Sequence, residues 1–374
     1  MGRNPSGQLK YLHIQETLYQ GILRGDYRNG QRLPTETELA KQHSCSRPTV
    51  SRALTQLQRE GFIERRAGSG TYVRYVDRPE KTLSFALLIP GLGETEIFEP
   101  ICGHMAHKAE EDGFRLIWSG SMSEGAEERK RQIEHLARRY AKEKVDGIFF
   151  APLERTSEKD TVNKRIMGLF AEAHIPVVLM DRDIVSFPLR SNYDLVGVDN
   201  VRIGYIVTEH LINHGCTSLK FVSRPYAAPT VKLRIIGYVQ AIREANLKIG
   251  VNGSNTVSIG EVEDQDFVRS LVHKKKLIGI VCENDTTAAR LMHHLSEMGY
   301  DIPGQVRVVG IDDLKYSEYL RVPLTTYRQP LKEIAATAVG LMLSRVADFG
   351  APARTVYLDG ELIVRRSCGC PREG

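Results

Sequence analysis

The 374-residue sequence predicts an α/β protein with a small N-terminal head and a larger body built on parallel sheets in two lobes. Three observations support this class. Residues 9 to about 75 contain three helical segments followed by a short hairpin. Residues 83 to about 367 alternate strand-like apolar runs with amphipathic helices. A polar segment with one proline, residues 76–82, separates the two patterns. We therefore expect a head at residues 1–75, a linker at 76–82 and a body at 83–374.

The composition is typical of a soluble globular protein rather than a membrane or secreted one. Hydrophobic residues make up 41% of the chain and charged residues 26%. The sequence has no apolar run long enough to cross a bilayer, and its first residues form no apolar signal core. The six cysteines show no disulfide spacing. These features predict a cytoplasmic protein without a membrane partner.

The positive charge is concentrated in the head. Residues 1–78 hold thirteen of the 51 Lys and Arg residues but only seven of the 46 Asp and Glu residues. The rest of the chain, with 38 basic and 39 acidic residues, is close to neutral. A basic head on a neutral body favours a polyanionic partner for the head. On charge alone, a solvated basic surface is an equal alternative.

The head pattern predicts three helices in succession. Apolar residues from Leu9 to Leu23 recur at helical spacing, and Gly25 follows them, where a C-terminal glycine is favoured. Thr35 and Glu38 have capping-box spacing, so a short second helix begins there. A third helix is expected after Ser46; its apolar face consists of Val50, Ala53, Leu54 and Leu57.

Two short strands, Phe62–Arg66 and Thr71–Arg74, follow the helices and flank a glycine-rich tip. Three helices and a hairpin in this order predict a winged helix-turn-helix. Such a recognition helix fits the DNA major groove, and its first residues reach base edges or phosphates. The expected DNA-binding residues are Arg47, Thr49, Ser51 and Arg52 on the third helix, Thr35 before the second, and Gly68, Ser69 and Gly70 at the wing tip.

The head resembles the GntR family of DNA-binding domains. The resemblance is carried by Leu33-Pro34-Thr35-Glu36-x-Glu38-Leu39-Ala40, by Ser46-Arg47-x-Thr49-Val50-x-x-Ala53-Leu54, and by Gly68-x-Gly70-Thr71-Tyr72-Val73. It implies that Arg47 and Thr49 contact double-stranded operator DNA. The chain departs from many members at Thr37 and Ser51, where they carry arginine, so the bases it reads stay open.

The body predicts parallel sheets covered by helices on both faces. About 285 residues of this pattern exceed one hydrophobic core, which indicates two α/β lobes. The expected strands are Phe85–Ile89, Arg115–Trp118, Gly147–Phe150, Val177–Met180, Leu219–Val222, Leu277–Val281 and Val306–Ile311. The expected helices are Ile101–Asp112, Glu127–Lys142, Val162–Ala173, Ile203–Asn213, Val231–Ala245 and Thr286–Met298.

Polar residues follow three of these strands, at the positions where α/β folds bind ligands. They are Asp181-Arg182-Asp183, Glu283-Asn284-Asp285 and Asp312-Asp313. Carboxylates, amides and a planar guanidinium suit a ligand with many hydroxyl groups. The alternative is that some of them only cap the following helices, and Asp285, before Thr286, favours that interpretation.

The body resembles the LacI/GalR effector domain, whose fold is similar to periplasmic sugar-binding proteins. The resemblance is carried by Val198-Asp199-Asn200-x-x-x-Gly204, Arg234-x-x-Gly237-Tyr238, Cys282-Glu283-Asn284-Asp285 and Val309-Gly310-Ile311-Asp312-Asp313. It implies effector contacts from Arg234, Asn284 and Asp312, from Asp181 or Arg182, and from Phe98 in the first loop. It also implies lobes at about 83–193 with 330–357 and about 194–328 with 358–366.

No catalytic, cofactor or metal site is expected. His210 and His214 stand four apart beside Glu209, which makes a metal site conceivable, but such a pair on an amphipathic helix is more often at the surface or in packing. Cys368-Gly369-Cys370 could also bind metal, but no second Cys pair accompanies it, and a frayed tail is the favoured interpretation. No nucleophile motif or phosphate-binding loop occurs.

A GntR-type head on a LacI-type body is similar in plan to arabinose repressors. This plan implies a non-enzymatic, homodimeric repressor of sugar-utilisation genes, whose operator binding is relieved by a small molecule, most simply a monosaccharide. Three alternatives stay open: a corepressor, a purine or nucleoside effector, and a sugar-binding or sugar-active protein with an appended head.

Overall fold

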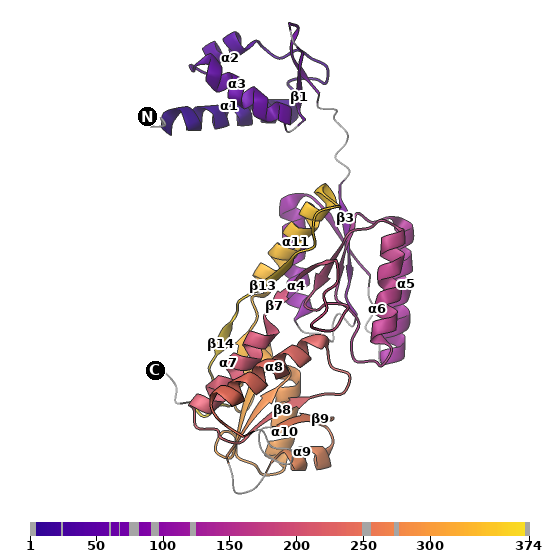
Figure 1. Cartoon of the computed structure of the whole chain (residues 1–374), viewed down its shortest axis with the longest axis vertical. Coiled ribbons are helices and arrows are strands. Elements are labelled where there is room, and N and C mark those ends of the chain that lie inside the picture. Colours follow the sequence, from indigo (N-terminus) through magenta and orange to yellow (C-terminus); the bar gives the residue numbers. More distant parts are fainter. Residues whose placement is uncertain are drawn as a thin grey trace. The chain divides into compact units, whose positions relative to one another are not determined.

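The chain divides into two compact units, Met1–Lys81 and Thr82–Gly374 (Figure 1). The computed structural model describes residues 5–23, 25–59, 61–66, 68–74, 82–90, 97–119, 125–248, 256–272 and 277–370. Apart from Thr82, the predicted linker 76–82 lies outside these residues.

The first unit is the predicted winged helix-turn-helix. It contains α1 (Pro5–Leu23), α2 (Glu36–Gln42), α3 (Arg47–Arg59), β1 (Ile63–Arg66) and β2 (Gly70–Val73). The two strands pair antiparallel, with Arg66 opposite Gly70 at the tip. Arg32 forms an additional antiparallel bridge with Tyr72, a pairing that the sequence pattern did not predict.

Local signals in the sequence set the helix boundaries of this unit. Thr35 caps α2: its hydroxyl accepts a hydrogen bond from the Glu38 N–H, and the Glu38 carboxylate accepts one from the Thr35 N–H at 2.7 Å. The capping box is therefore confirmed. The predicted apolar face of α3 is fully buried against α1 and α2 and forms the core of the unit.

The second unit contains two six-stranded sheets, which confirms the predicted α/β class with parallel sheets. The first sheet has the order β13-β7-β6-β5-β3-β4, all parallel. Its strands are β3 (Ser84–Leu88), β4 (Arg115–Trp118), β5 (Gly147–Phe150), β6 (Val177–Met180), β7 (Asp194–Val198) and β13 (Thr355–Leu358).

The second sheet has the order β14-β12-β11-β10-β8-β9, and only β14 runs antiparallel to its neighbour. Its strands are β8 (Leu219–Ser223), β9 (Thr256–Ile259), β10 (Ile278–Cys282), β11 (Val306–Asp312), β12 (Thr325–Arg328) and β14 (Glu361–Ile363). The helices of this unit are α4 (Phe98–Asp112), α5 (Ala126–Glu143), α6 (Lys159–Glu172), α7 (Asn200–Asn213), α8 (Pro229–Glu244), α9 (Gln265–Leu271), α10 (Asp285–Glu297) and α11 (Leu331–Ala347), with a 3-10 turn at Lys315–Glu318.

Both faces of each sheet are apolar because helices cover both. In β3, Phe85 and Leu87 join a core with α4 and α11, whereas Ala86 and Leu88 join another with α5 and α6 (Figure 1). In the second sheet, α7 and α8 contribute to one core and α9 and α10 to the other. Burial on both faces explains why the strands read as continuous apolar runs.

The lobe boundaries differ from the expected ones at two places. Residues 194–198, expected to begin the second lobe, form β7 between β6 and β13 of the first sheet, so the chain leaves that lobe after Val198. Leu358, expected to begin a strand of the second lobe that runs to Arg366, instead ends β13 of the first sheet, and the strand in the second sheet is the shorter β14. Gly360 lies between them, where a side-chain Cβ would stand 1.9 Å from the Arg328 carbonyl oxygen.

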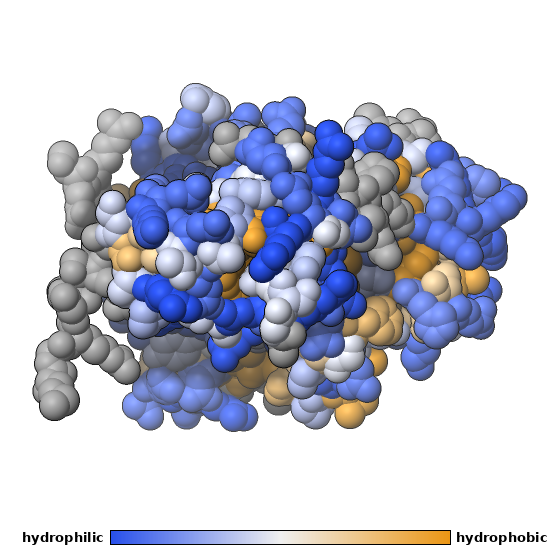
Figure 2. Space-filling model, turned by 90° about the horizontal axis from the view of Figure 1, so that it is seen from above, coloured by the Kyte–Doolittle hydropathy of each residue, from blue (hydrophilic) through white to orange (hydrophobic). Residues whose placement is uncertain are grey.

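The exposed surface is mostly hydrophilic, as the face in Figure 2 shows. Large exposed apolar side chains occur mainly as separated residues such as Trp118, Phe187 and Tyr319. Among the described residues, no helix is both long and apolar enough to span a membrane.

A buried ion pair ties α11 to β7. The Arg345 guanidinium donates hydrogen bonds to the Asp194 carboxylate at 2.9 Å. It also donates to the carbonyl oxygens of Phe349 and Pro352, in the segment that follows α11. The Asp194 side chain is 0% exposed and that of Arg345 is 11% exposed. Arg354 also approaches Asp194, at 3.5 Å, but its side chain is 42% exposed.

We expect Arg345→Ala to destabilise the second unit by about 3–5 kcal/mol, because it leaves the Asp194 carboxylate buried without its main counter-charge. Arg354→Ala is the matched control and should cost at most about 1 kcal/mol, since its side chain is partly exposed. The midpoint of thermal unfolding, followed by circular dichroism, measures both. Equal midpoints for the two variants would contradict the assigned role of Arg345.

Candidate functional site

The start of α3 presents an exposed cationic surface. Arg47 is the first residue of the helix and is exposed, and no hydrogen bond or ion pair with another described residue engages it. Thr49 follows two residues later, and its hydroxyl is 2.8 Å from the Ser46 hydroxyl. A guanidinium in this position is available to a base edge or a phosphate.

The neighbouring candidates are already engaged within the head. The Arg52 guanidinium stacks on the Tyr11 ring, 4.2 Å from its centroid. The Ser51 hydroxyl accepts a hydrogen bond from Arg65 at 3.3 Å, and Arg65 also forms an ion pair with Glu36. These contacts hold the wing and α1 against the helices. The Thr35 side chain is likewise occupied by the capping box.

The wing tip depends on two glycines with positive φ. Gly68 has φ +72° and Gly70 has φ +125°, backbone conformations that side chains disfavour. The Ser69 hydroxyl is 2.8 Å from the Tyr72 hydroxyl, and the Arg66 guanidinium lies 4.9 Å from the Tyr72 ring centroid. The tip is thus compact, with cationic groups beside it.

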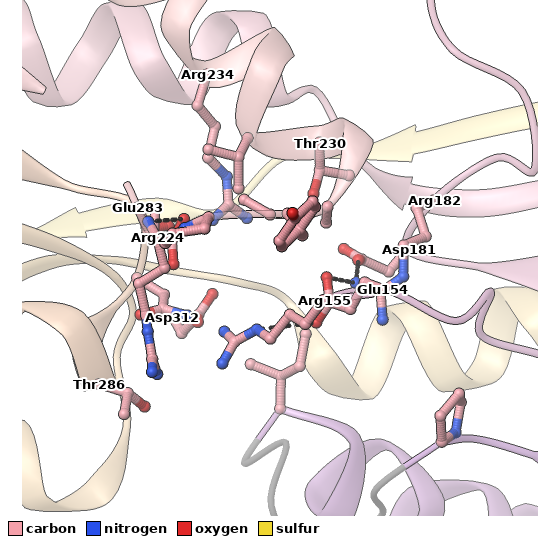
Figure 3. A pocket seen from close by; sticks show the side chains of 18 of the residues that line it. Glu154, Arg155, Asp181, Arg182, Arg224, Thr230, Arg234, Glu283, Thr286 and Asp312 are labelled. Carbon is pink, nitrogen blue, oxygen red and sulfur yellow. Dashed lines mark hydrogen bonds and ion pairs between the residues drawn. The ribbon is translucent and has the colours of Figure 1, made fainter. Parts of the chain in front are cut away.

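In the second unit, a cavity of about 790 Å³ lies at the carboxyl ends of strands from both sheets (Figure 3). Its lining includes all six residues that were expected to contact an effector. These are Phe98, Asp181, Arg182, Arg234, Asn284 and Asp312. The structure therefore brings together residues that lie more than 200 positions apart in the sequence.

The first sheet supplies Asp181 and Arg182, directly after β6. Asp181 has φ +67°, a sharp turn that ends the strand. Arg182 is buried; it donates to the Pro152 carbonyl oxygen at 2.9 Å, to Glu154 at 2.8 Å and to Asp181 at 3.2 Å (Figure 3). Its guanidinium carbon is 5.9 Å from the ring centroid of Phe98, the buried first residue of α4.

Arg234 reaches into the cavity from α8 (Figure 3). Its side chain is buried and is held in position by two partners. Nε donates to the Asn200 side-chain oxygen at 2.8 Å, and a terminal nitrogen donates to the Glu283 carbonyl oxygen. The planar guanidinium is consequently fixed before any ligand arrives.

Asn284, and not Asp285, caps α10, and it also lines the cavity. Asn284 is the N-cap of α10, and its side-chain oxygen accepts from the Thr287 N–H at 2.9 Å. Asp285 is no cap: it is completely buried and accepts hydrogen bonds from Ser317, Thr326 and the Leu314 N–H. The expectation that Asp285 caps the helix was wrong because Asp285 is the first residue of the helix, and the preceding Asn284 reaches the Thr287 N–H instead.

Asp312 ends β11 with φ +126° and accepts a hydrogen bond from Gln329 at 2.6 Å. Burial raises the pKa of Asp312 to about 8, against the nearby positive charge of Arg234. The pKa values of Asp181 and Glu283 are also raised by burial. At neutral pH the Asp312 carboxyl therefore carries a proton and can donate as well as accept a hydrogen bond.

Cavity residues that follow β5 and β8 were not among those predicted from the sequence. Glu154 and Arg155 come from the first of these loops, and Arg224 and Tyr226 from the second. The Arg155 N–H donates to the Tyr226 carbonyl oxygen at 3.0 Å, so the two loops touch across the cavity. Ligands of α/β folds bind at the carboxyl ends of parallel strands, and this rule predicted the residues after β6, β10 and β11. Applied to β5 and β8, the same rule would have predicted these four residues.

Comparison with known proteins identifies both units. Residues 10–73 match the model described as bacterial regulatory proteins, gntR family. Residues 208–368 match the periplasmic binding protein-like domain.

Two relatives and one solved structure illustrate the similarity. The chain is 26% identical over 365 residues to the arabinose metabolism transcriptional repressor of Geobacillus stearothermophilus, covering 95% of both chains. It is 30% identical over 233 residues to the HTH-type transcriptional repressor PurR of Vibrio campbellii, covering 62% of this chain and 66% of the relative.

A LacI family transcriptional regulator from Enterococcus faecium, solved with bound ribose, shares the fold of the second unit. Its TM-score is 0.60 at 20% identity, over 76% of this chain and 98% of that one. The chain therefore combines a DNA-binding domain of the gntR family of bacterial regulatory proteins with a periplasmic binding protein-like domain.

Proposed function

We propose that this protein is a sugar-responsive transcriptional repressor of sugar-utilisation genes. The observation that carries the proposal is a cavity lined by fixed hydrogen-bonding groups from two sheets, in a chain that also has a gntR-family head. The exposed Arg47 at the start of α3, together with Thr49 and the wing tip, supplies the surface for operator DNA.

The polar lining of the cavity suits a ligand with many hydroxyl groups. Its described lining includes six arginines and five Asp or Glu residues. Several of these arginines already face carboxylates: Arg182 pairs with Glu154 and Asp181, and Arg224 pairs with Glu261. The fixed donors and acceptors of the lining match the hydroxyl groups of a sugar.

The relatives support this ligand class and also one competitor. The relative aligned over nearly its whole length is an arabinose metabolism repressor, and the fold neighbour holds ribose. A purine or nucleoside is the second candidate, since PurR repressors also match. Among the described lining residues the aromatic rings are Phe98 and Tyr226, and Phe98 already faces Arg182. This arrangement favours the sugar.

In the proposed mechanism, the ligand changes the relative position of the two DNA-binding heads of a homodimer. The protein acts as a homodimer on a roughly palindromic operator, one half-site per head. Sugar in the cavity stabilises one relative position of the two sheets, whose loops meet at Arg155 and Tyr226. A preference of about 2–3 kcal/mol for that position lowers operator affinity by roughly 30- to 150-fold.

We expect Arg47→Ala to weaken specific operator binding by about 1–3 kcal/mol, because its guanidinium reaches a base edge or phosphate. Arg59→Ala is the matched control: Arg59 is also exposed and ends the same helix, three turns from the contact, so its loss should change affinity little. Fluorescence anisotropy on operator and on unrelated DNA measures both. Equal affinity of the Arg47 variant and the unchanged protein would remove Arg47 from the interface.

We expect a monosaccharide to raise the thermal unfolding midpoint of the protein. At about 100 times its dissociation constant, such a ligand stabilises the folded state by roughly 2.7 kcal/mol. Arg234→Lys should reduce the shift, because lysine cannot replace the planar fork, whereas Arg243→Lys at the exposed end of α8 should preserve it. A screen of monosaccharides and nucleosides tests the ligand class, and a shift from nucleosides alone would contradict the sugar.

We expect Asp312→Asn to become more stable relative to the unchanged protein as pH rises. Asp312 ionises at 3.8 when unfolded but near 8 when folded, so the proton it keeps stabilises the folded state at low pH. This stabilisation decreases as pH rises towards 8, because the folded protein then loses the proton. Asparagine does not ionise, so the stability of the variant lacks this dependence on pH. The difference between the two unfolding midpoints at about pH 5 and about pH 8 measures it. A constant difference would show that Asp312 ionises normally.

A further inference from the structure

Three potential metal ligands meet at the end of the second sheet. His210 lies in the last turn of α7, and Cys368 and Cys370 follow β14. The Nε2 atom of His210 is 3.6 Å from the Cys370 sulfur, which is 3.1 Å from the Cys368 sulfur. One ligand atom from each residue lies within 4.8 Å of the other two, and no other group of this kind occurs among the described residues.

The fold holds this cluster firmly. The Ser367 hydroxyl donates to the Val308 carbonyl oxygen at 2.6 Å and accepts from the Thr325 N–H at 2.8 Å. These bonds fix the chain that carries both cysteines across β11 and β12. Cys368 is completely buried, whereas His210 and Cys370 are partly exposed. The cluster is therefore rigid and also open to an ion from solvent.

We propose that His210, Cys368 and Cys370 form a metal site for Zn²⁺ or a similar thiophilic divalent cation. Two thiolates and one imidazole are ligands that Zn²⁺ prefers, and three protein ligands leave a fourth position open. This proposal is independent of the proposed function, because it invokes neither DNA nor the cavity.

The spacing of the three atoms fits tetrahedral zinc. Zn–N and Zn–S bonds of about 2.05 and 2.3 Å place a nitrogen and a sulfur about 3.6 Å apart, and two sulfurs about 3.8 Å apart. The observed distance between His210 Nε2 and Cys370 Sγ, 3.6 Å, matches the expected nitrogen–sulfur distance. The sulfurs are closer than the second value, and a small rotation of the partly exposed Cys370 side chain separates them.

The charges around the cluster suit a neutral complex of Zn²⁺ with two thiolates. A neutral imidazole adds no charge of its own, so one Zn²⁺ and two thiolates balance. Binding of the metal displaces the two thiol protons, which pass to solvent. Arg307 is beside Gly369, and its buried Nε has no hydrogen-bond partner. This cation favours the thiolate forms.

The test is titration of the reduced, metal-free full-length protein with Co²⁺, a spectroscopic substitute for Zn²⁺. We expect one equivalent per chain to produce a sulfur-to-cobalt charge-transfer band and the intense visible bands of tetrahedral Co²⁺, and Zn²⁺ to remove both. Cys370→Ser and His210→Gln should each weaken Co²⁺ binding by more than about tenfold. Both side chains are partly exposed, so these variants should fold, and circular dichroism checks this.

Cys102→Ser and His293→Gln are the matched controls, since each removes a similar ligand elsewhere in the same unit and should bind Co²⁺ unchanged. Absence of the bands in the folded, reduced protein would overturn the proposal. So would unchanged Co²⁺ affinity in the Cys370 and His210 variants. Failure of sugar or operator binding in the earlier experiments would leave this result unaffected.

Discussion

The parallel direction of the strands is the constraint on which the cavity depends. In a parallel sheet every strand ends at the same edge, so the loops after β5 and β6 gather at one edge of the first sheet and those after β8, β10 and β11 at one edge of the second. Each sheet must also be covered on both faces, which fixes its helices. The chain crosses between the sheets several times, and these crossings allow both edges to contribute to one cavity.

Backbone geometry at the strand ends then directs the side chains. Asp181 and Asp312 both adopt positive φ, which turns the chain sharply as each strand ends. The resulting carboxyl groups are buried close to Arg182 and Arg234, and burial raises the pKa of both. The raised pKa values of Asp181 and Asp312 therefore follow from the positions at which β6 and β11 end.

The sequence was sufficient for features whose cause is local. The capping box at Thr35, the apolar face of α3 and the buried runs of β5 and β6 all depend on residues close together in the chain. The missed features depend on distant partners. β7 was not among the expected strands; it begins with Asp194, and the Arg345 guanidinium that accompanies this buried carboxylate lies 151 positions away. His210 and the two cysteines were considered separately for the same reason, since only the fold brings them together.

The way Arg234 is held has a consequence for the thermodynamics of recognition. Immobilising a flexible side chain on binding costs about 0.5–1.5 kcal/mol of conformational entropy. Here Asn200 and the Glu283 carbonyl oxygen restrict the guanidinium during folding, before a ligand enters. The entropic cost of restricting Arg234 is therefore part of the free energy of folding and does not reduce the free energy of ligand binding. Asn200 thus contributes to ligand affinity by limiting the freedom of Arg234, a contribution independent of any contact of its own with the ligand.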